Sequence, residues 1–283
     1  MLEEFIKKYL LFGIERIPIS DIGIDVETAK VLNDLGLLQL TSNTYLELKK
    51  PSAVARSLCF LKKYDPLFPV IVGYEDVKEL ICRSFNEVGL NILFIGPPAS
   101  GKTLFLESIY MLNKDRAVYV DISNTTPAGL LDLLYISMPE ILCLDELDKP
   151  YDRRVYYTLS NILEYGNIII TKYNKTMSFR FRGNVYGGAN TENSIQEHIR
   201  DRFLKIYLRT YTIDEIREIT TTALVKFGVI PDAGLAAEVV DRCINAGIIS
   251  IRDIIKIGKF VKSKEDINLL NKIIYRLNKR RLV

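Results

Sequence analysis

Short apolar runs recur through the middle of the chain, and each is followed by a segment of helical character. Runs of this length, bounded by turn signals, are typical of strands that are buried on both faces. Alternating strands and helices predict an α/β fold, with a parallel sheet covered by helices on both sides. A ligand of such a sheet binds at the carboxyl ends of its strands. The five predicted strands are Ile92 to Ile95, Ala117 to Val120, Ile141 to Asp145, Val185 to Ala189 and Leu204 to Leu208.

Residues 1–65 have a different pattern, which reads as helix, turn, helix and hairpin. Helical spacing over Val26 to Leu35 is followed by two alternating segments on either side of the turn Ser42-Asn43. This order resembles that of a winged helix-turn-helix. A helix that reads DNA normally carries basic or amide side chains. This helix has few, so the unit is expected to contact either DNA or an unidentified protein partner. Its polar side chains include Lys30 and Asn33 against Asp25, Glu27 and Asp34.

The middle and the end of the chain differ from this leading part and from each other. Two prolines in Asp65 to Pro69 break the helical pattern and predict a boundary. After Thr210 only helical patterns remain, which predicts a separate helical bundle. We therefore expect a winged-helix-like unit at 1–65, an α/β core at 66–210 and a helical part at 211–283. The predicted helices of the last part begin near Thr212 and cover Asp232 to Ala246, Ser250 to Val261 and Glu265 to Arg280.

The turn after the first predicted strand fits the phosphate-binding pattern G-x-x-x-x-G-K-[ST]. Successive backbone N–H groups of such a loop turn inward around phosphate oxygens, and glycine is needed where a side chain would block the approach. Lys102 is expected to bridge the β and γ phosphates of ATP, and Thr103 to ligate Mg²⁺. A P-loop NTPase core is therefore predicted. Its expected phosphate-binding residues are Gly96, Pro97, Pro98, Ala99, Ser100, Gly101, Lys102 and Thr103.

The predicted strand Ile141 to Asp145 is followed at once by a second carboxylate. Asp145 is expected to hold Mg²⁺, and Glu146 is placed to orient or deprotonate the attacking water. This pairing favours hydrolysis over nucleotide binding alone. Asp148 and Lys149 are predicted to be solvated surface residues.

Composition limits the remaining possibilities. Lysine and arginine number 38 against 35 aspartates and glutamates, a surplus too small to indicate a nucleic-acid protein by bulk charge. Any contact with nucleic acid must therefore be local. The four cysteines are isolated in apolar surroundings without C-x-x-C spacing, which predicts buried reduced thiols rather than a zinc site. No apolar stretch approaches membrane-spanning length, so we expect a soluble cytoplasmic protein.

From residue 66 to about 265 the ordered motifs resemble those of AAA+ ATPases. The segment 69–76 is similar to the family's segment that packs on adenine, so the resemblance implies base contacts from Val72 and Gly73. Asn190 ends a strand as the family's sensor 1 does, and would hold the attacking water. Arg252, at the start of a predicted helix, is similar to sensor 2, which would make 211–283 a lid over the nucleotide.

The sequence Arg200-Asp-Arg-Phe203 resembles the place where the family carries its arginine finger. Such a finger acts on the nucleotide of the next subunit, so the resemblance implies a ring, with a hexamer as the expected size. Arg202, directly before the phenylalanine, is the first candidate for this finger and Arg200 the second. The alternative is that the two arginines are an ordinary surface pair bridged to Asp201.

Residues 167–182 predict a hairpin inserted before the sensor 1 strand. Met177, Phe179 and Phe181 fall on one face of its second strand, which has a strand's period of two. The insertion resembles that of the AAA+ branch containing RuvB branch-migration motors, MCM helicases and MoxR-type chaperones. In the DNA motors a basic residue at the hairpin tip contacts phosphates, which implies this role for Lys175, supported by Lys172. An ordinary charged turn is the alternative.

The resemblance thus implies an AAA+ ATPase that uses ATP and Mg²⁺ to remodel or translocate a substrate as a ring. The leading reading is a helicase-like or branch-migration-like motor on DNA. One alternative is a MoxR-like remodeller of proteins, with the leading unit as adaptor. Another is an ATP-dependent DNA-binding switch that resembles origin initiators. In RuvB and MCM proteins the winged domain follows the motor, whereas here the winged-helix-like unit precedes it.

Overall fold

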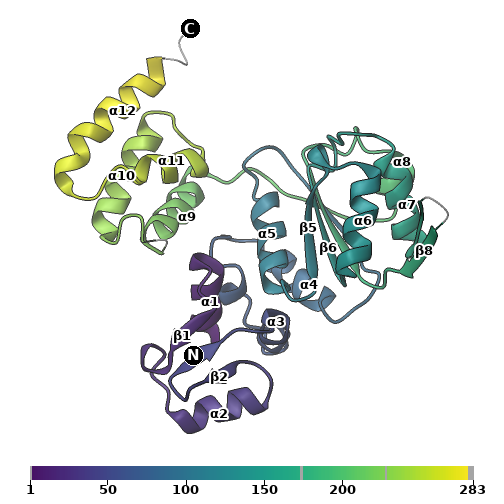
Figure 1. The fold of residues 1–283 in the computed structure, drawn as a ribbon. Helices are drawn as coiled ribbons and strands as arrows, with labels where there is room; N and C mark the ends of the chain where they lie inside the picture. Colours follow the sequence, from purple (N-terminus) through teal and green to yellow (C-terminus); the bar gives the residue numbers. More distant parts are fainter. Residues whose placement is uncertain (1, 173–174, 227, 280–283) are drawn as a thin grey trace. The chain divides into compact units, whose positions relative to one another are not determined.

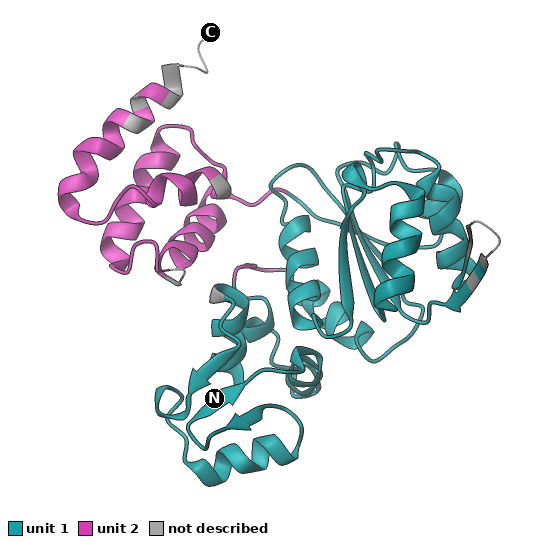
Figure 2. Ribbon diagram, viewed as in Figure 1, with its two compact units in different colours: residues 1–69, 74–209 teal, residues 70–73, 210–283 magenta. Residues whose placement is uncertain are grey.

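The computed structural model describes residues 2–172, 175–226 and 228–279 (Figure 1). They divide into two compact units, which Figure 2 distinguishes by colour. Unit 1 comprises Met1–Pro69 and Tyr74–Arg209, and unit 2 comprises Val70–Gly73 and Thr210–Val283. The chain therefore passes from unit 1 to unit 2 and back around residues 70–73, and returns to unit 2 after Arg209.

The centre of unit 1 is a five-stranded sheet in the order β10-β4-β9-β6-β5, with every neighbouring pair parallel. This confirms the predicted α/β fold with a parallel sheet of five strands. Because the order along the sheet differs from the order along the chain, the strand before Asn190 lies between the strand before the predicted phosphate loop and the strand that ends at Asp145. The strands are β4 (Ile92–Ile95), β5 (Ala117–Asp121), β6 (Ile141–Asp145), β9 (Asn184–Ala189) and β10 (Leu204–Tyr207).

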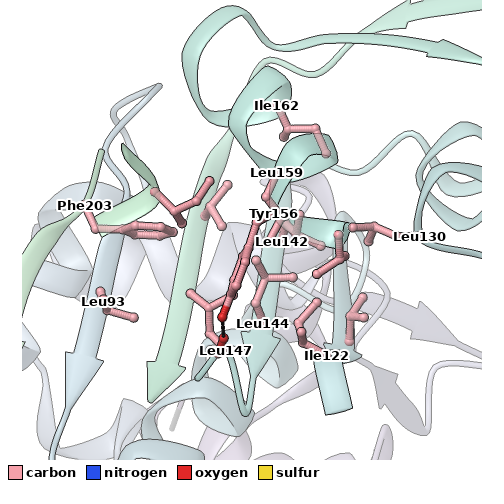
Figure 3. Close-up of a cluster of buried hydrophobic side chains, with 14 of the residues drawn as sticks. Leu93, Ile122, Leu130, Leu142, Leu144, Leu147, Tyr156, Leu159, Ile162 and Phe203 are labelled. Atoms are coloured by element: carbon pink, nitrogen blue, oxygen red, sulfur yellow. Dashed lines mark hydrogen bonds between the residues drawn. The ribbon is translucent and has the colours of Figure 1, made fainter. Parts of the chain in front are cut away.

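Helices cover both faces of this sheet. Alternate residues of β4 contact the helices on opposite faces. Phe94 stacks on Phe105 with ring centroids 5.3 Å apart, on the face covered by α5. Leu93 and Ile95 point the other way, into the buried cluster beneath α6 and α7 shown in Figure 3. Burial on both faces explains the uninterrupted apolar character of the strand. The helices of this core are α4 (Glu75–Ser84), α5 (Lys102–Leu112), α6 (Pro127–Ser137), α7 (Val155–Tyr165) and α8 (Glu197–Arg200).

The leading residues form a small antiparallel sheet in the order β1-β3-β2, flanked by helices. Asp25 begins the second helix by accepting a hydrogen bond from the Thr28 N–H at 2.7 Å. The predicted order of helix, turn, helix and hairpin is present, and the winged-helix-like assignment stays a prediction. The strand β1 and the helix α3 were not predicted. The elements are α1 (Leu2–Phe12), β1 (Arg16–Pro18), α2 (Val26–Asp34), β2 (Gln39–Thr41), β3 (Tyr45–Glu47) and α3 (Pro51–Phe60).

Polar contacts join this leading part to the core within unit 1. The Tyr9 hydroxyl donates to the carbonyl of Met111 at 3.1 Å, at the end of α5. Ser52, in α3, donates its N–H and its hydroxyl to the Asp115 carboxylate at 3.1 and 2.6 Å. Residues 1–65 and the core therefore belong to one compact unit, and independent folding of 1–65 stays a prediction.

The predicted hairpin is present as the antiparallel strands β7 (Asn167–Lys172) and β8 (Lys175–Arg180). Phe179 contacts Tyr135 of α6 with ring centroids 6.1 Å apart, whereas Ser178 and Arg180 are exposed. This alternation is the one that the sequence predicts. Lys172 and Lys175 are opposite each other in the register, but their side chains lie outside the described part of the chain.

Unit 2 is helical, as predicted, apart from its short first segment. Its helices begin at capping residues that the sequence contains: Asp232 accepts from the Leu235 N–H at 2.6 Å and Ser250 from the Asp253 N–H at 3.3 Å. No helix within the described ranges is long and apolar enough to cross a membrane. The helices are α9 (Ile213–Lys226), α10 (Ala233–Asn245), α11 (Ile251–Gly258) and α12 (Ile267–Lys279).

Candidate nucleotide-binding site

The predicted phosphate loop connects β4 to α5 at the carboxyl edge of the sheet. A side chain at Gly96 would place its Cβ 2.4 Å from the carbonyl oxygen of Leu208 and 2.7 Å from the Ser100 hydroxyl, so only glycine fits there. Gly101 has φ +93° and begins α5, and Ala99 also has a positive φ, of +64°. The loop is therefore tightly turned, and Gly96 lies too close to Leu208 and Ser100 to carry a side chain. A glycine-containing loop of this kind can turn backbone N–H groups toward phosphate oxygens.

Lys102 lies inside this loop with 8% of its surface exposed. Its ammonium donates to the carbonyls of Gly96 and Pro97 at 2.7 and 2.8 Å. Burial lowers the pKa of Lys102, and the charges of Asp145 and Asp148 oppose that shift. A buried ammonium whose close partners are neutral oxygens is well suited to receive an anion. The loop thus fits the phosphates of a nucleotide.

The Asp145 carboxylate, at the end of β6, is held by three donors. The Thr103 hydroxyl donates to Oδ2 at 3.1 Å, the Tyr119 hydroxyl to the same oxygen at 2.6 Å, and the Glu146 N–H to Oδ1 at 2.9 Å. The structure therefore brings together the two predicted metal ligands. Hydroxyl and carboxylate oxygens are the donors that Mg²⁺ prefers, so this pair fits the ion. Burial and the hydrogen bond to Asp145 raise the pKa of Tyr119 above its usual value.

Glu146 follows Asp145 with an unusual backbone conformation, φ +54°. Its carboxylate is 39% exposed and forms an ion pair with Lys149. Lys149 is exposed, as predicted, and the hydrogen bond that it donates to Glu146 raises the pKa of Lys149. The predicted catalytic base is thus adjacent to the metal ligand and open to solvent, with one lysine as its partner.

Asp148 corrects a prediction, because it is buried rather than solvated. Only 8% of its surface is exposed, and its Oδ1 has no hydrogen-bond partner among the described residues. The physical reason is local. The Leu147 N–H donates to Gly188 at 2.8 Å and the Tyr156 hydroxyl donates to the Leu147 carbonyl at 2.7 Å, a bond drawn in Figure 3. These contacts fix the chain against β9 and α7. Burial and, after it, the Asp148 charge raise the pKa of Tyr156 to about 12.

Asn190 directly follows β9, which lies between β4 and β6. Ala189 pairs with Ile95 at the start of the phosphate loop and accepts the Gly96 N–H at 3.2 Å. Asn190 is therefore at the same edge of the sheet as the loop and the carboxylates, as its predicted role requires. Gly188 was not predicted: a Cβ there would lie 3.1 Å from Asp145 Oδ1 and 2.9 Å from Leu106.

The two arginines near the end of the core have different surroundings. Arg202 donates to the Glu164 carboxylate and to the carbonyl of His198, and the hydrogen bond from Arg202 lowers the pKa of Glu164. The predicted alternative, a pair with Asp201, is replaced by this pair with Glu164. Arg200 lies 3.9 Å from Glu192, and its Nε is buried without a partner among the described residues.

The remaining predicted residues belong to unit 2. Val72 and Gly73 lie in its short first segment, where Gly73 has φ +71°. Arg252 is the second residue of α11, and its side chain falls outside the described part of the chain. Roles in adenine binding and as sensor 2 stay predictions for these residues.

Comparison with known proteins gives a structural match and no sequence match. No protein-family model matches the chain, and no curated protein matches it. The solved structure of the Thermotoga maritima RuvB Holliday junction branch migration motor matches with a TM-score of 0.53 at 19% identity, over 72% of this chain and 68% of that one. A variant of the same RuvB matches with a TM-score of 0.54 at 20% identity, over 73% and 69%. The chain therefore has the fold of these RuvB structures.

Proposed function

We propose that this protein is a Mg²⁺-dependent ATP hydrolase of the AAA+ type that acts on DNA as a ring-shaped oligomer, with a hexamer as the expected size. The observation that carries the proposal is the contact of 3.1 Å between the Thr103 hydroxyl and Asp145, beside a phosphate loop that encloses Lys102. Glu146 supplies a second carboxylate next to Asp145, which supports hydrolysis over binding alone.

Within this site each residue has one task. The loop N–H groups and Lys102 bind the phosphates, and Lys102 exchanges its loop carbonyls for phosphate oxygens. Thr103 and Asp145 would hold Mg²⁺, which neutralises charge on the transferring phosphoryl group when it is bound. Glu146 leaves Lys149, orients the attacking water and accepts its proton on a carboxylate oxygen. Asn190 holds that water from the neighbouring strand.

The ring is part of the proposal because Arg202 is assigned to the nucleotide of the next subunit. A cation supplied across the interface stabilises the charge of the transition state and makes hydrolysis depend on assembly. For this, the ion pair between Arg202 and Glu164 must break, so that Arg202 can contact the nucleotide bound by the neighbouring subunit. Arg252 is assigned to the γ-phosphate of its own subunit, and Val72 and Gly73 to the adenine.

DNA is the proposed substrate on two grounds. The RuvB structures that share the fold include one described as a Holliday junction branch migration motor. The hairpin β7–β8 is present and places the backbone of Lys172 and Lys175 at its end. A lysine at that place can contact successive phosphates without reading bases, as a motor requires.

The first test is steady-state ATP hydrolysis with and without single-stranded, duplex and four-way-junction DNA, at low and moderate salt. We expect DNA to stimulate hydrolysis, and the stimulation to fade as salt rises. Lys175→Ala should lose the stimulation and keep the basal rate, whereas the control Lys272→Ala, at an exposed position of α12, should keep both. Stimulation that survives in Lys175→Ala would exclude the hairpin from DNA contact.

A second candidate function, remodelling of a protein partner, is favoured by the surface of α2. Val31 and Leu35 are 56% and 66% exposed, and the Asn33 side chain already accepts a hydrogen bond from the Leu40 N–H at 3.0 Å. An apolar and acidic helix suits a protein surface better than a DNA groove. Hydrolysis that none of the three DNAs alters would make this function the leading one. Glu146→Gln with ATP should then retain a partner protein.

A further inference from the structure

Tyr119 is a side chain of the site that no sequence motif includes. It lies in β5, and its hydroxyl donates to Asp145 Oδ2 at 2.6 Å, the shortest of the three hydrogen bonds to that carboxylate. In the register of the sheet Tyr119 pairs with Cys143, two residues before Asp145. Its side chain therefore extends along the neighbouring strand toward the carboxyl edge to reach the carboxylate.

The ring that carries this hydroxyl is itself held in place. It packs edge to face against Tyr110 of α5, with ring centroids 5.8 Å apart and an angle of 69° between the planes. The same helix begins with Lys102 and Thr103. The position of the hydroxyl is thus fixed relative to the helix that carries the phosphate-binding lysine.

The three donors to Asp145 differ in what they do when a divalent ion is bound. The N–H of the next residue, Glu146, binds Oδ1 and makes no contact with Oδ2. Thr103 and Tyr119 both donate to Oδ2, and a carboxylate oxygen has about two lone-pair directions. If Thr103 turns its oxygen toward the ion, one direction at Oδ2 opens, while Tyr119 still occupies the other.

We infer that Tyr119 is a positioning residue of the Mg²⁺ site: its hydroxyl fixes the orientation in which the Asp145 carboxylate meets the ion. This inference rests on the proposed function, since it assigns Asp145 to the metal. Hydrogen-bonded partners of metal ligands typically change metal affinity or activity about 10-fold to 100-fold when they are removed.

Tyr119→Phe tests the inference because it removes the hydroxyl and keeps the ring against Tyr110. The matched control is Tyr110→Phe, which makes the same chemical change on the partner ring, whose hydroxyl has no hydrogen bond among the described side chains. Circular dichroism of both variants should match the unsubstituted protein, so that a binding change reports the site.

Three measurements separate the outcomes. A fluorescent ATP analogue in EDTA reports nucleotide binding without metal, and should bind all three proteins alike. Electron paramagnetic resonance of Mn²⁺ with a non-hydrolysable ATP analogue reports the metal site directly. Tyr119→Phe should weaken Mn²⁺ binding, and raise the Mg²⁺ concentration for half-maximal hydrolysis, about 10-fold to 100-fold, and Tyr110→Phe should change neither.

Unchanged Mn²⁺ affinity in Tyr119→Phe would overturn the inference and leave the ATPase assignment intact. Equal losses in both variants would also overturn it, because they would point to the packed pair of rings rather than to the hydroxyl. Absence of nucleotide binding by the unsubstituted protein would instead contradict the proposed function itself.

Discussion

Glu146 holds a backbone conformation that side-chain-bearing residues rarely adopt, with φ +54°. Such a conformation costs about 1–3 kcal/mol and persists only where the surroundings fix it. Here the Glu146 N–H is bound by Asp145 and the next N–H, of Leu147, by Gly188. The strained turn separates two neighbouring carboxylates into different contacts: Asp145 with the loop threonine and Glu146 with Lys149.

Glu146→Gln should leave nucleotide binding within a few fold and lower turnover by about 10²-fold to 10⁴-fold, the usual contribution of a general base. The amide keeps the shape of the side chain but cannot accept the proton. Binding is measured by fluorescence titration with an ATP analogue and turnover by phosphate release.

The control for this change is Glu87→Gln, which alters an exposed carboxylate in the loop between α4 and β4. It should behave as the unsubstituted protein. Normal turnover in Glu146→Gln would assign the base elsewhere, and the buried carboxylate of Asp148 would be the next to test.

At the scale of an element, β9 combines full burial with two adjacent glycines. A Cβ at Gly187 would lie 2.9 Å from Leu93 and 3.2 Å from Leu147, which are apolar side chains of the core. A Cβ at Gly188 would meet Leu106 and, at 3.1 Å, the Asp145 carboxylate. A side chain at either position would therefore be crowded, on opposite faces of the strand, and only the one at Gly188 would contact the candidate site.

Gly187→Ala and Gly188→Ala should each lower the free energy of unfolding by about 1–3 kcal/mol, since both overpack a dense core. Only Gly188→Ala should also weaken Mn²⁺ binding in the presence of nucleotide, because it displaces Asp145. Urea unfolding and Mn²⁺ titration on both variants make the comparison. Equal Mn²⁺ affinities would show that the carboxylate tolerates the added methyl group.

The sequence predicted elements and motifs well for a common reason. The core strands are short, mostly apolar runs, with Lys205 in β10 as an interruption, and the loop at 96–103 and the pair Asp145-Glu146 are contiguous too. Tyr119 and Gly188 escaped prediction because their roles depend on which strands are neighbours, and the sheet order is not written along the chain. Asp148 was misjudged because its burial comes from contacts of the adjacent Leu147.

For the whole molecule, the proposed ring makes Arg202 a residue that serves another subunit. Arg202→Ala should bind nucleotide normally and lose turnover by about 10³-fold or more, the contribution typical of an arginine finger. Mixing it with Glu146→Gln should restore part of the activity, because in mixed rings an intact arginine can face an intact site. Phosphate release across a series of mixing ratios measures this.

Glu164→Gln is the matched change on the other side of the ion pair. It removes the partner's charge and leaves the arginine in place, so turnover should persist. If the pair were merely structural, both variants would lose activity to the same extent, and mixing would restore nothing.

The neighbours of β4 in the sheet are synthesised long after β4 itself, which affects the nascent chain. β4 carries the phosphate loop, and one of its two neighbours is β10, at residues 204–207. At about 5–20 residues per second, β4 waits on the order of ten seconds after its synthesis before β10 emerges from the ribosome. Its other neighbour, β9, is also made late, at residues 184–189, so for most of that time both edges of the apolar strand Ile92–Ile95 have unpaired backbone groups, which can recruit other chains. Nascent chains are therefore most prone to aggregate at the strand that bears their phosphate loop.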